Sequence, residues 1–431
     1  MVFGPCQGPN AVDVPTTNLI LGGEAVPWRK EYKYVGVWFN STTRDIFRSH
    51  YEHKHDAAAF VFWKTVLGCD HYVGRGHLPP EVGRRLYYAL IDCHLTHGCD
   101  VALDVDSTSF ALLNSLNNVI LRRILGVGKR SGIPQLYSEL GIYPLGVRRL
   151  ALALRYLGYL VALPPSHLAW KACLEADRLR QAGHSSWYGD LAILLRDLPF
   201  SGPALPPLGN LNAAICKRLH DELIAGMKQW VLDSGEGMVS IPLLHGRLEP
   251  QEEGAPRRIP LCQRHYLSVV SITDHRLALT RLLCGSFYFR GLRTNLQDHS
   301  PASLLCRKCG SGLETPGHVF MQCRDSQTVA ARETLRERLP QEFGVTLRTA
   351  GSSADAMRSM QKLIFDLKTV VPMARFVYQV VRAWRWFGRR LPTMVSELAP
   401  DTDEEADYWN FESAEEDLET YGPEMEMEID F

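Results

Sequence analysis

Hydrophobic residues recur at helical spacing through most of the chain, whereas a strand pattern is confined to its N-terminal end. Residues 16–40 are rich in strand-forming side chains on both sides of Gly22-Gly23, which predicts one β-hairpin whose second strand spans 34–39. From Thr43 onward, apolar residues recur every three or four positions, as on one face of a helix. The pattern therefore predicts a mainly α protein with an N-terminal hairpin.

Start and stop signals bound the predicted helices. Pro79-Pro80 can begin a helix, Asp106 can cap the next one, and Gly126 can end it. Helices are expected over residues 44–67, 80–97, 107–125, 145–163, 211–232, 272–285, 325–339 and 354–391. Residues 245–260 show little periodicity, and we expect them to form a linker.

Five units follow from this pattern. They are a hairpin over 1–42, a helical bundle over 43–163, a helical connector and linker over 164–260, a small Cys/His module with trailing helices over 261–398, and an acidic tail over 399–431. The tail is almost without aliphatic residues, so we expect it to be disordered.

Charge is unevenly distributed along the 431 residues. The net charge is -1, but residues 401–431 contain fourteen Asp or Glu and no Lys or Arg, so residues 1–400 carry a net +13. A basic body with an acidic tail fits a protein that binds polyanions, and the alternative is an ordinary solvated surface. The sequence has no run of eighteen apolar residues, no secretory signal pattern and eleven scattered cysteines, so we expect an intracellular protein, nuclear or cytoplasmic.

The strongest local motif has the spacing C-x2-C-x8-H-x4-C. Its residues are Cys306, Cys309, His318 and Cys323. Three thiolates and one imidazole are the ligand set of a closed, tetrahedral structural zinc site. Gly310 and Gly312 would let the chain bend behind the first pair, and a short helix would bring the second pair to the metal. We expect one structural zinc ion, and the alternative is four unconnected core or surface residues.

A closed site has no open position for a substrate, which favours binding or scaffolding over catalysis. A polymerase would need clustered carboxylates that hold two divalent metals. Asp104 and Asp106 are the nearest arrangement in the sequence, but they fall at a helix start, where capping is the simpler role. The sequence contains no Tyr-x-Asp-Asp motif.

Two basic segments could contact nucleic acid. The first lies around the end of the helix predicted over 107–125, and its residues are Arg122, Arg123, Lys129 and Arg130. These side chains could bind phosphates or could complement the helix dipole, and both interpretations stay open. In the second, aromatic residues alternate with Arg382, Arg385 and Arg389. This pattern could stack and neutralise a single strand, but it favours an amphipathic helix with its tryptophans in the core.

Several segments resemble a known family when they are taken in order. Tyr32-Lys33-Tyr34-Val35-Gly36-Val37 resembles a Lys-Tyr-Leu-Gly strand, with Val35 in place of leucine, and Met1–Gly4 resembles the strand before it. Residues 120–142 resemble a pair of thumb helices, and 276–323 resembles a C-terminal zinc knuckle in which Glu314 precedes His318 by four positions. Together they are similar to the C-terminal half of the reverse transcriptases of non-LTR (LINE-like) retrotransposons, particularly fungal ones.

This resemblance implies a primer-grip-like hairpin on a thumb-like helical bundle, with a CCHC zinc knuckle. It places Lys33 near a primer backbone and the basic residues of 122–130 near a template duplex, so RNA, DNA or both are the expected partners. The family's catalytic aspartates would lie upstream of Met1. We therefore expect a nucleic-acid-binding remnant, truncated upstream of Met1, without polymerase activity of its own.

Two alternative functions stay open. The first is a zinc-stabilised protein-interaction or scaffold module, whose partner would bind the 381–390 helix or the surface that faces the palm in the family. The second is part of an RNA-directed DNA polymerase that another chain completes in trans.

Overall fold

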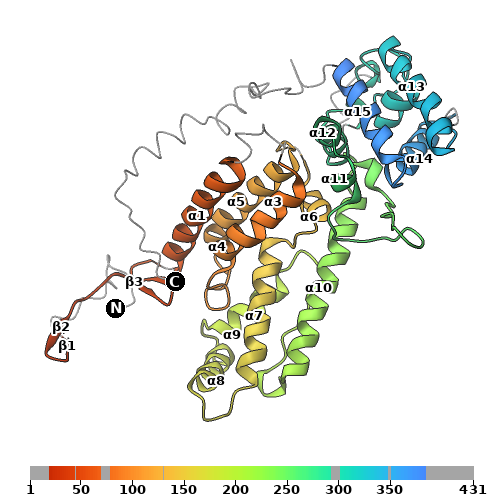
Figure 1. The fold of residues 1–431 in the computed structure, drawn as a ribbon. Helices are drawn as coiled ribbons and strands as arrows, with labels where there is room; N and C mark the ends of the chain where they lie inside the picture. The colour runs from red at the N-terminus through yellow and green to blue at the C-terminus, as the bar shows by residue number, and fades with distance from the viewer. Residues whose placement is uncertain are drawn as a thin grey trace.

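A computed structural model describes residues 19–43, 45–68, 78–129, 131–292, 301–347 and 351–384. These residues are mostly helical, with small hairpins at the N-terminal end and a Cys/His cluster near residues 306–323 (Figure 1). The predicted mainly α fold class is confirmed. The acidic tail lies outside the described residues. None of the described helices has the length and apolarity needed to cross a membrane.

The N-terminal strands form two hairpins. Strands β1 (Leu19–Leu21) and β2 (Glu24–Val26) meet at Gly22-Gly23, as predicted, and β3 (Glu31–Tyr34) pairs with β4 (Val37–Asn40). The prediction of one strand over 34–39 is wrong, because Val35 and Gly36 form a turn with φ of +49° and +78°. Tight hairpin turns need positive φ at both central positions, which glycine adopts freely and valine rarely.

Among the described residues, five α-helices and two π-helical stretches form a bundle beside these hairpins. They are α1 (Arg48–Phe62) with a π-helical end over Trp63–Leu67, α3 (Pro80–Leu86) joined to α4 (Asp92–Thr96) by a π-helical stretch over Tyr87–Ile91, α5 (Ser107–Leu125) and α6 (Ile133–Leu140). The caps of α5 are those predicted. Asp106 Oδ1 accepts hydrogen bonds from the backbone N–H of Thr108 at 2.9 Å and of Ser109 at 2.8 Å. Gly126 ends the helix in the left-handed conformation.

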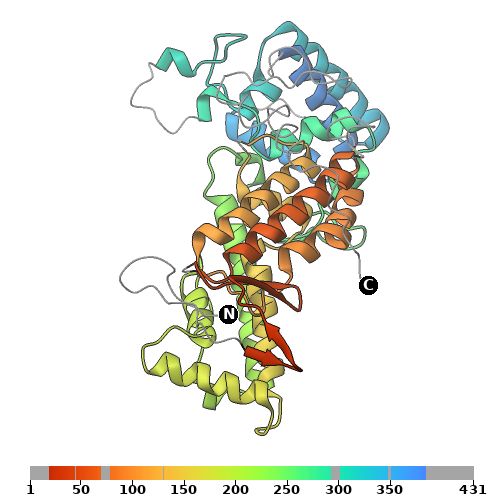
Figure 2. The ribbon, with the colours of Figure 1, turned by 90° about the vertical axis from the view of Figure 1, so that its left-hand side faces the viewer.

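Four helices form an arm that extends away from the bundle (Figures 1 and 2). Helices α7 (Leu145–Val161) and α10 (Ala213–Glu236) pack along each other in opposite directions, and α8 (Leu168–Gln181) and α9 (Trp187–Arg196) pack beside α7. The arm has its own hydrophobic core, to which α7 contributes Leu154 and Leu157 and α10 contributes Leu223 and Met227.

The C-terminal part contains five helices. They are α11 (His265–Val269), α12 (Thr273–Leu283), α13 (Ser326–Phe343), α14 (Ser353–Ile364) and α15 (Val370–Trp384). The single helix predicted over 354–391 is therefore wrong within the described residues. Asp366 Oδ1 accepts hydrogen bonds from the backbone N–H of Lys368 and of Thr369. These bonds start a new helix, because they satisfy N–H groups that have no intrahelical acceptor.

One hydrophobic core joins the bundle to the C-terminal helices. It runs from Tyr51 through Ile124, Leu140, Leu279 and Phe376 without a break between clusters. The bundle expected over 43–163 and the module expected over 261–398 therefore share a core, and α7 belongs mainly to the separate core of the arm. Packing divides the chain into a main body and an arm.

A buried carboxylate lies where the bundle meets the C-terminal helices. Glu139, at the end of α6, has no exposed surface. Its Oε1 accepts a hydrogen bond from Arg247 at 2.5 Å, and its Oε2 accepts one from the hydroxyl of Tyr266 at 2.7 Å. The guanidinium of Arg264 lies 3.7 Å from Oε1. Burial opposes ionisation, but Arg247 and Arg264 outweigh it and lower the pKa of Glu139.

A second buried carboxylate extends this network. Glu249 is 4% exposed, and its Oε1 accepts hydrogen bonds at 2.8 Å from the backbone N–H and the imidazole of His265. The other ring nitrogen of His265 lies 2.9 Å from the carbonyl of Ile364. Burial is outweighed here too, and the pKa of Glu249 falls to about 2. The linker predicted over 245–260 has no helix or strand, and Glu249 is the buried residue that attaches it to α11.

Glu139→Gln tests the weight of this network. The substitution keeps the shape of the side chain but removes the charge that faces Arg247 and one of the two carboxylates beside Arg264, which keeps Glu249 at 3.4 Å. The free energy of unfolding should therefore fall by about 3 kcal/mol or more. Urea denaturation at pH 7 measures the difference. The control is Glu342→Gln, which removes an exposed partner of Arg338 and should change the free energy of unfolding far less, because solvent screens exposed ion pairs. An equally small decrease in the free energy of unfolding for both variants would contradict a stabilising role for the Glu139 network.

Candidate metal centre

The structure brings the four predicted ligands together. One ligand atom from each of Cys306, Cys309, His318 and Cys323 lies within 4.8 Å of all the others. The sulfurs of Cys306 and Cys323 are 3.7 Å apart, and the sulfur of Cys309 is 3.2 Å from Nε2 of His318. Four donor atoms at such separations surround a space in which a single metal ion fits. The predicted grouping of these four side chains is thereby confirmed, and the group could hold a metal ion.

A glycine-rich turn positions the first two cysteines. The backbone N–H of Gly310 donates to the carbonyl of Cys306 at 2.8 Å, and that of Cys306 donates to the carbonyl of Gly312 at 3.0 Å. Both glycines have positive φ. A Cβ on Gly312 would lie 2.9 Å from the His318 ring, so this position needs glycine for its space as well as its conformation.

A π-helical turn positions the other two ligands. It spans His318–Gln322, and the backbone N–H of Cys323 donates to the carbonyl of His318 at 2.7 Å. This i→i+5 bond places residues five apart one above the other, which an α-helical turn does not do. The predicted short helix is confirmed in this wider form. Between the ligands, Val319 and Phe320 are fully buried in the main core, and Phe320 packs edge-on against Phe376 of α15.

Glu314 fixes the turn without being a ligand. It has no exposed surface, and it accepts hydrogen bonds from the backbone N–H of Arg307 at 2.9 Å and of Arg290 at 3.2 Å. The guanidinium of Arg307 also donates to it, at 2.5 Å from Nη2. Burial raises the pKa of the carboxyl, but the hydrogen bonds from Arg307 prevail and lower it. The acidic residue before His318 therefore holds the loop that carries Cys306 and Cys309.

A buried arginine lies behind the fourth ligand. Arg332 of α13 is 7% exposed, and its Nη2 donates to the carbonyl of Cys323 at 2.7 Å. Its Nη1 has no hydrogen-bond partner among the described residues. A metal ion held by three thiolates carries a surplus of negative charge that a buried guanidinium offsets. Nothing in the C-x2-C-x8-H-x4-C spacing points to Arg332, which comes from the following helix.

Protonation distinguishes the three cysteines. Burial raises the pKa of Cys306, and it raises that of Cys323 to about 12. Burial also acts on Cys309, but hydrogen bonds from Ser311, from the backbone of Arg324 and from His318 lower its pKa to about 5. Thiolates are the form that binds metals. A metal cation bound by the four donor atoms would stabilise all three cysteines as thiolates.

The other predicted site residues are spread over the molecule. Lys33 is exposed on β3, with its ammonium 5.7 Å from the centre of the Trp38 ring. Arg122 and Arg123 are half-buried in the last turn of α5, and Lys129 is exposed. Arg382 is exposed on α15, at the far end of the molecule from β3 (Figure 1). Arg130, Arg385 and Arg389 lie outside the described residues.

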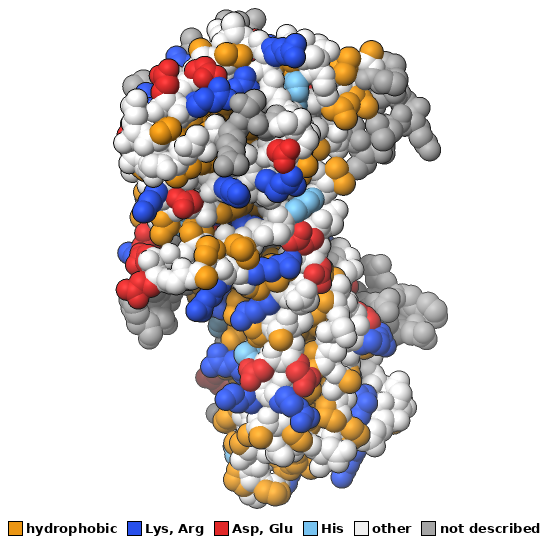
Figure 3. Space-filling model, turned by 90° about the vertical axis from the view of Figure 1, so that its right-hand side faces the viewer, with side chains coloured by type: hydrophobic (Ala, Val, Ile, Leu, Met, Phe, Trp, Pro, Cys, Tyr) orange, Lys and Arg blue, Asp and Glu red, His pale blue; other side chains and the backbone are white. Residues whose placement is uncertain are grey.

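Basic side chains are also dispersed over the face shown in Figure 3. Lys and Arg occur over its upper and lower parts, with Asp and Glu between them. The nine cysteines within the described residues are all free of disulfides. Cys93 is exposed.

In comparisons with known proteins, the chain matches no protein-family model, no curated protein and no solved structure.

Proposed function

We propose that this chain holds one structural zinc ion and binds nucleic acid, like the C-terminal part of the non-LTR reverse transcriptases that it resembles. The observation that carries the proposal is the convergence of three sulfurs and one imidazole nitrogen within 4.8 Å. Zinc is the metal that favours this set in a closed tetrahedral site. With Zn–S bonds of about 2.3 Å, the edge of such a tetrahedron is about 3.7 Å, which is the distance between the sulfurs of Cys306 and Cys323.

The zinc would act on folding and not on a substrate. Four protein ligands complete its coordination, so no position is open for a reacting group. Cys306 and Cys323 would hold it from within the main core, and Cys309 and His318 from its edge. The ion would then fix the glycine turn and the π-helical turn against α13 and α15.

Nucleic-acid binding is supported by charge and by the order of motifs. Residues 1–400 carry a net +13, and each lysine or arginine that neutralises a phosphate releases a counterion. Lys33, Lys129 and Arg382 have exposed side chains. The zinc centre and the sequence order of hairpin, bundle and knuckle agree with the family that the sequence resembles.

Elemental analysis of purified protein tests the metal. We expect one zinc per chain in the wild type and in Cys93→Ser, which removes an exposed cysteine outside the cluster. Cys309→Ser should lose the zinc, because a hydroxyl is a poor substitute for a thiolate ligand. Since Cys306 and Cys323 lie in the core shared with α5 and α6, the variant should also melt at lower temperature throughout the main body. Well-folded wild type without zinc would refute this part of the proposal.

Titration with labelled RNA and DNA tests the second part. We expect binding to a structured RNA or to DNA at low salt, with log K falling linearly as log salt rises. Fluorescence anisotropy between 50 and 200 mM salt measures the slope. A scaffold that binds only proteins predicts weak, salt-insensitive binding instead. No binding to either nucleic acid at low salt would eliminate the proposed function.

One observation favours a second candidate, a part of a polymerase completed by a palm domain. The hairpins expose Ile20, Leu21, Tyr34 and Val35, each by more than 60%. Exposed apolar residues at the ends of both hairpins would become buried if a palm domain packed against them. This candidate predicts that the chain increases primer extension by a separately purified palm of this family, and that Leu21→Lys removes the increase. Val239→Lys, at another exposed apolar position, is the control. An unchanged rate with the wild-type chain would exclude the candidate.

A further inference from the structure

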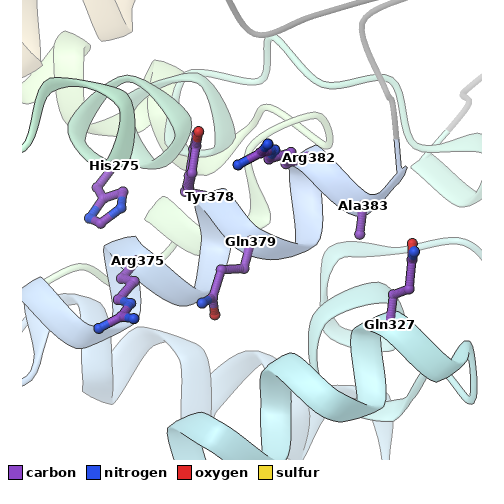
Figure 4. Close-up of a pocket in the computed structure, with 7 residues that line it drawn as sticks. All are labelled: His275, Gln327, Arg375, Tyr378, Gln379, Arg382 and Ala383. Carbon is purple, nitrogen blue, oxygen red and sulfur yellow. The ribbon is translucent and has the colours of Figure 1, made fainter. Parts of the chain in front are cut away.

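A basic hollow lies between three helices of the C-terminal part. Its volume is about 580 Å³, and its walls include His275 of α12, Gln327 of α13, and Arg375, Tyr378, Gln379 and Arg382 of α15 (Figure 4). None of the described side chains that line it is acidic. Its size is in the range of pockets that bind small ligands, so a nucleotide-sized group can enter it.

Helix α15 presents these polar side chains because its other face is buried. Phe376, Val377 and Val380 lie in the main core, so Arg375, Gln379 and Arg382 follow one another along the opposite face at intervals of four and three residues. The two arginines are seven residues apart, which corresponds to about 10 Å along the helix axis. They stand at separate points of the hollow, with the amide of Gln379 between them (Figure 4).

These two arginines differ from others on the neighbouring helices. Arg338 on α13 is held by Glu342, and Arg358 on α14 is held by Asp355. Arg375 and Arg382 are exposed and make no ion pair or hydrogen bond with the described residues. Their charges and donors are therefore available to a ligand.

The surroundings of the hollow keep its charge positive. Burial lowers the pKa of His275, and the neighbouring Arg375 lowers it further, whereas Asp274 acts in the opposite direction. Arg375 also lowers the pKa of Glu342, a carboxylate that is already paired with Arg338. The rings of His275 and Tyr378 lie 5.1 Å apart and form an aromatic wall beside the two guanidinium groups.

We propose that this hollow binds single-stranded nucleic acid, with Arg375 and Arg382 on two phosphates and the aromatic wall beside a base. Guanidinium groups match phosphate geometry, and aromatic rings stack on any base. A duplex keeps its bases inside, so only a single strand can place one in the hollow. The inference rests on the proposed nucleic-acid function and gives that function a location. Of the residues that line the hollow, Arg382 is the one that the sequence pattern predicted as a nucleic-acid contact.

The test compares charge-matched variants of the full chain. Arg375→Gln combined with Arg382→Gln removes both proposed phosphate contacts, and Arg178→Gln combined with Arg358→Gln removes two arginines that carboxylates already hold, away from Arg375. Fluorescence anisotropy with a labelled single-stranded RNA at several salt concentrations gives affinity and slope. The first pair should weaken binding about tenfold or more and reduce the slope of log K against log salt by about 1.4, since each phosphate contributes about 0.7. The second pair should change affinity less than about twofold.

A third variant tests the same site with both arginines in place. Gln379→Glu adds a carboxylate at a half-buried position of the hollow, and it should weaken binding while the circular dichroism spectrum stays unchanged. If the wild type binds RNA and the Arg375/Arg382 pair binds as tightly as its control, the hollow is not the site, although the proposed function stands. If the wild type binds no nucleic acid, both fail.

Discussion

The main body depends on one buried charge, the carboxylate of Glu139. It has no exposed surface, and it is held by Arg247, Arg264 and Tyr266, which lie more than a hundred residues later in the chain. A buried ion is tolerated only where its partners are correctly placed. The carboxylate therefore fixes α6 against α11 and against the segment that carries Arg247 and Glu249. Through His265 and the carbonyl of Ile364, the same network reaches α14. The bundle and the C-terminal helices form one body because separating them would leave the buried charges of this network without their partners.

The metal centre is built onto this body. Small zinc modules in general obtain most of their folding free energy from the ion. Here Cys306, Cys323 and Phe320 belong to a core that also contains residues of α5 and α6. Glu314 and Arg332 hold the ligand loops from opposite sides, through Arg307 and through the carbonyl of Cys323. The protein thus orients the four side chains with contacts of its own, and a metal ion would join them into one centre.

Local sequence signals predicted much of this structure. They did not predict which residues far apart in the chain pair with each other. Asp106 and Gly126 marked both ends of α5, and the four ligands could be recognised because they fall in one short stretch. The turn at Val35-Gly36 was missed because valine seldom adopts positive φ, and the break at Asp366 because apolar spacing continues across it. Glu139 and Arg247 gave no signal, since nothing local indicates which distant charges will meet. The face that unites Arg375 with His275 exists only once α12 and α15 are packed.

The arm has a different consequence. Helices α7 and α10 share a core with α8 and α9, and Leu261 is a side chain that packs against both this core and that of the main body. Cooperative units in proteins follow such divisions of packing, and each can open with its own free energy. The far end of the arm can therefore fluctuate, or change in length at the turns between its helices, while Arg149 of α7 stays paired with Asp104 of the bundle and Glu139 and the Cys/His cluster keep their partners. In evolution, insertions should be tolerated best in the arm and least in the main body, where they would disturb the shared core.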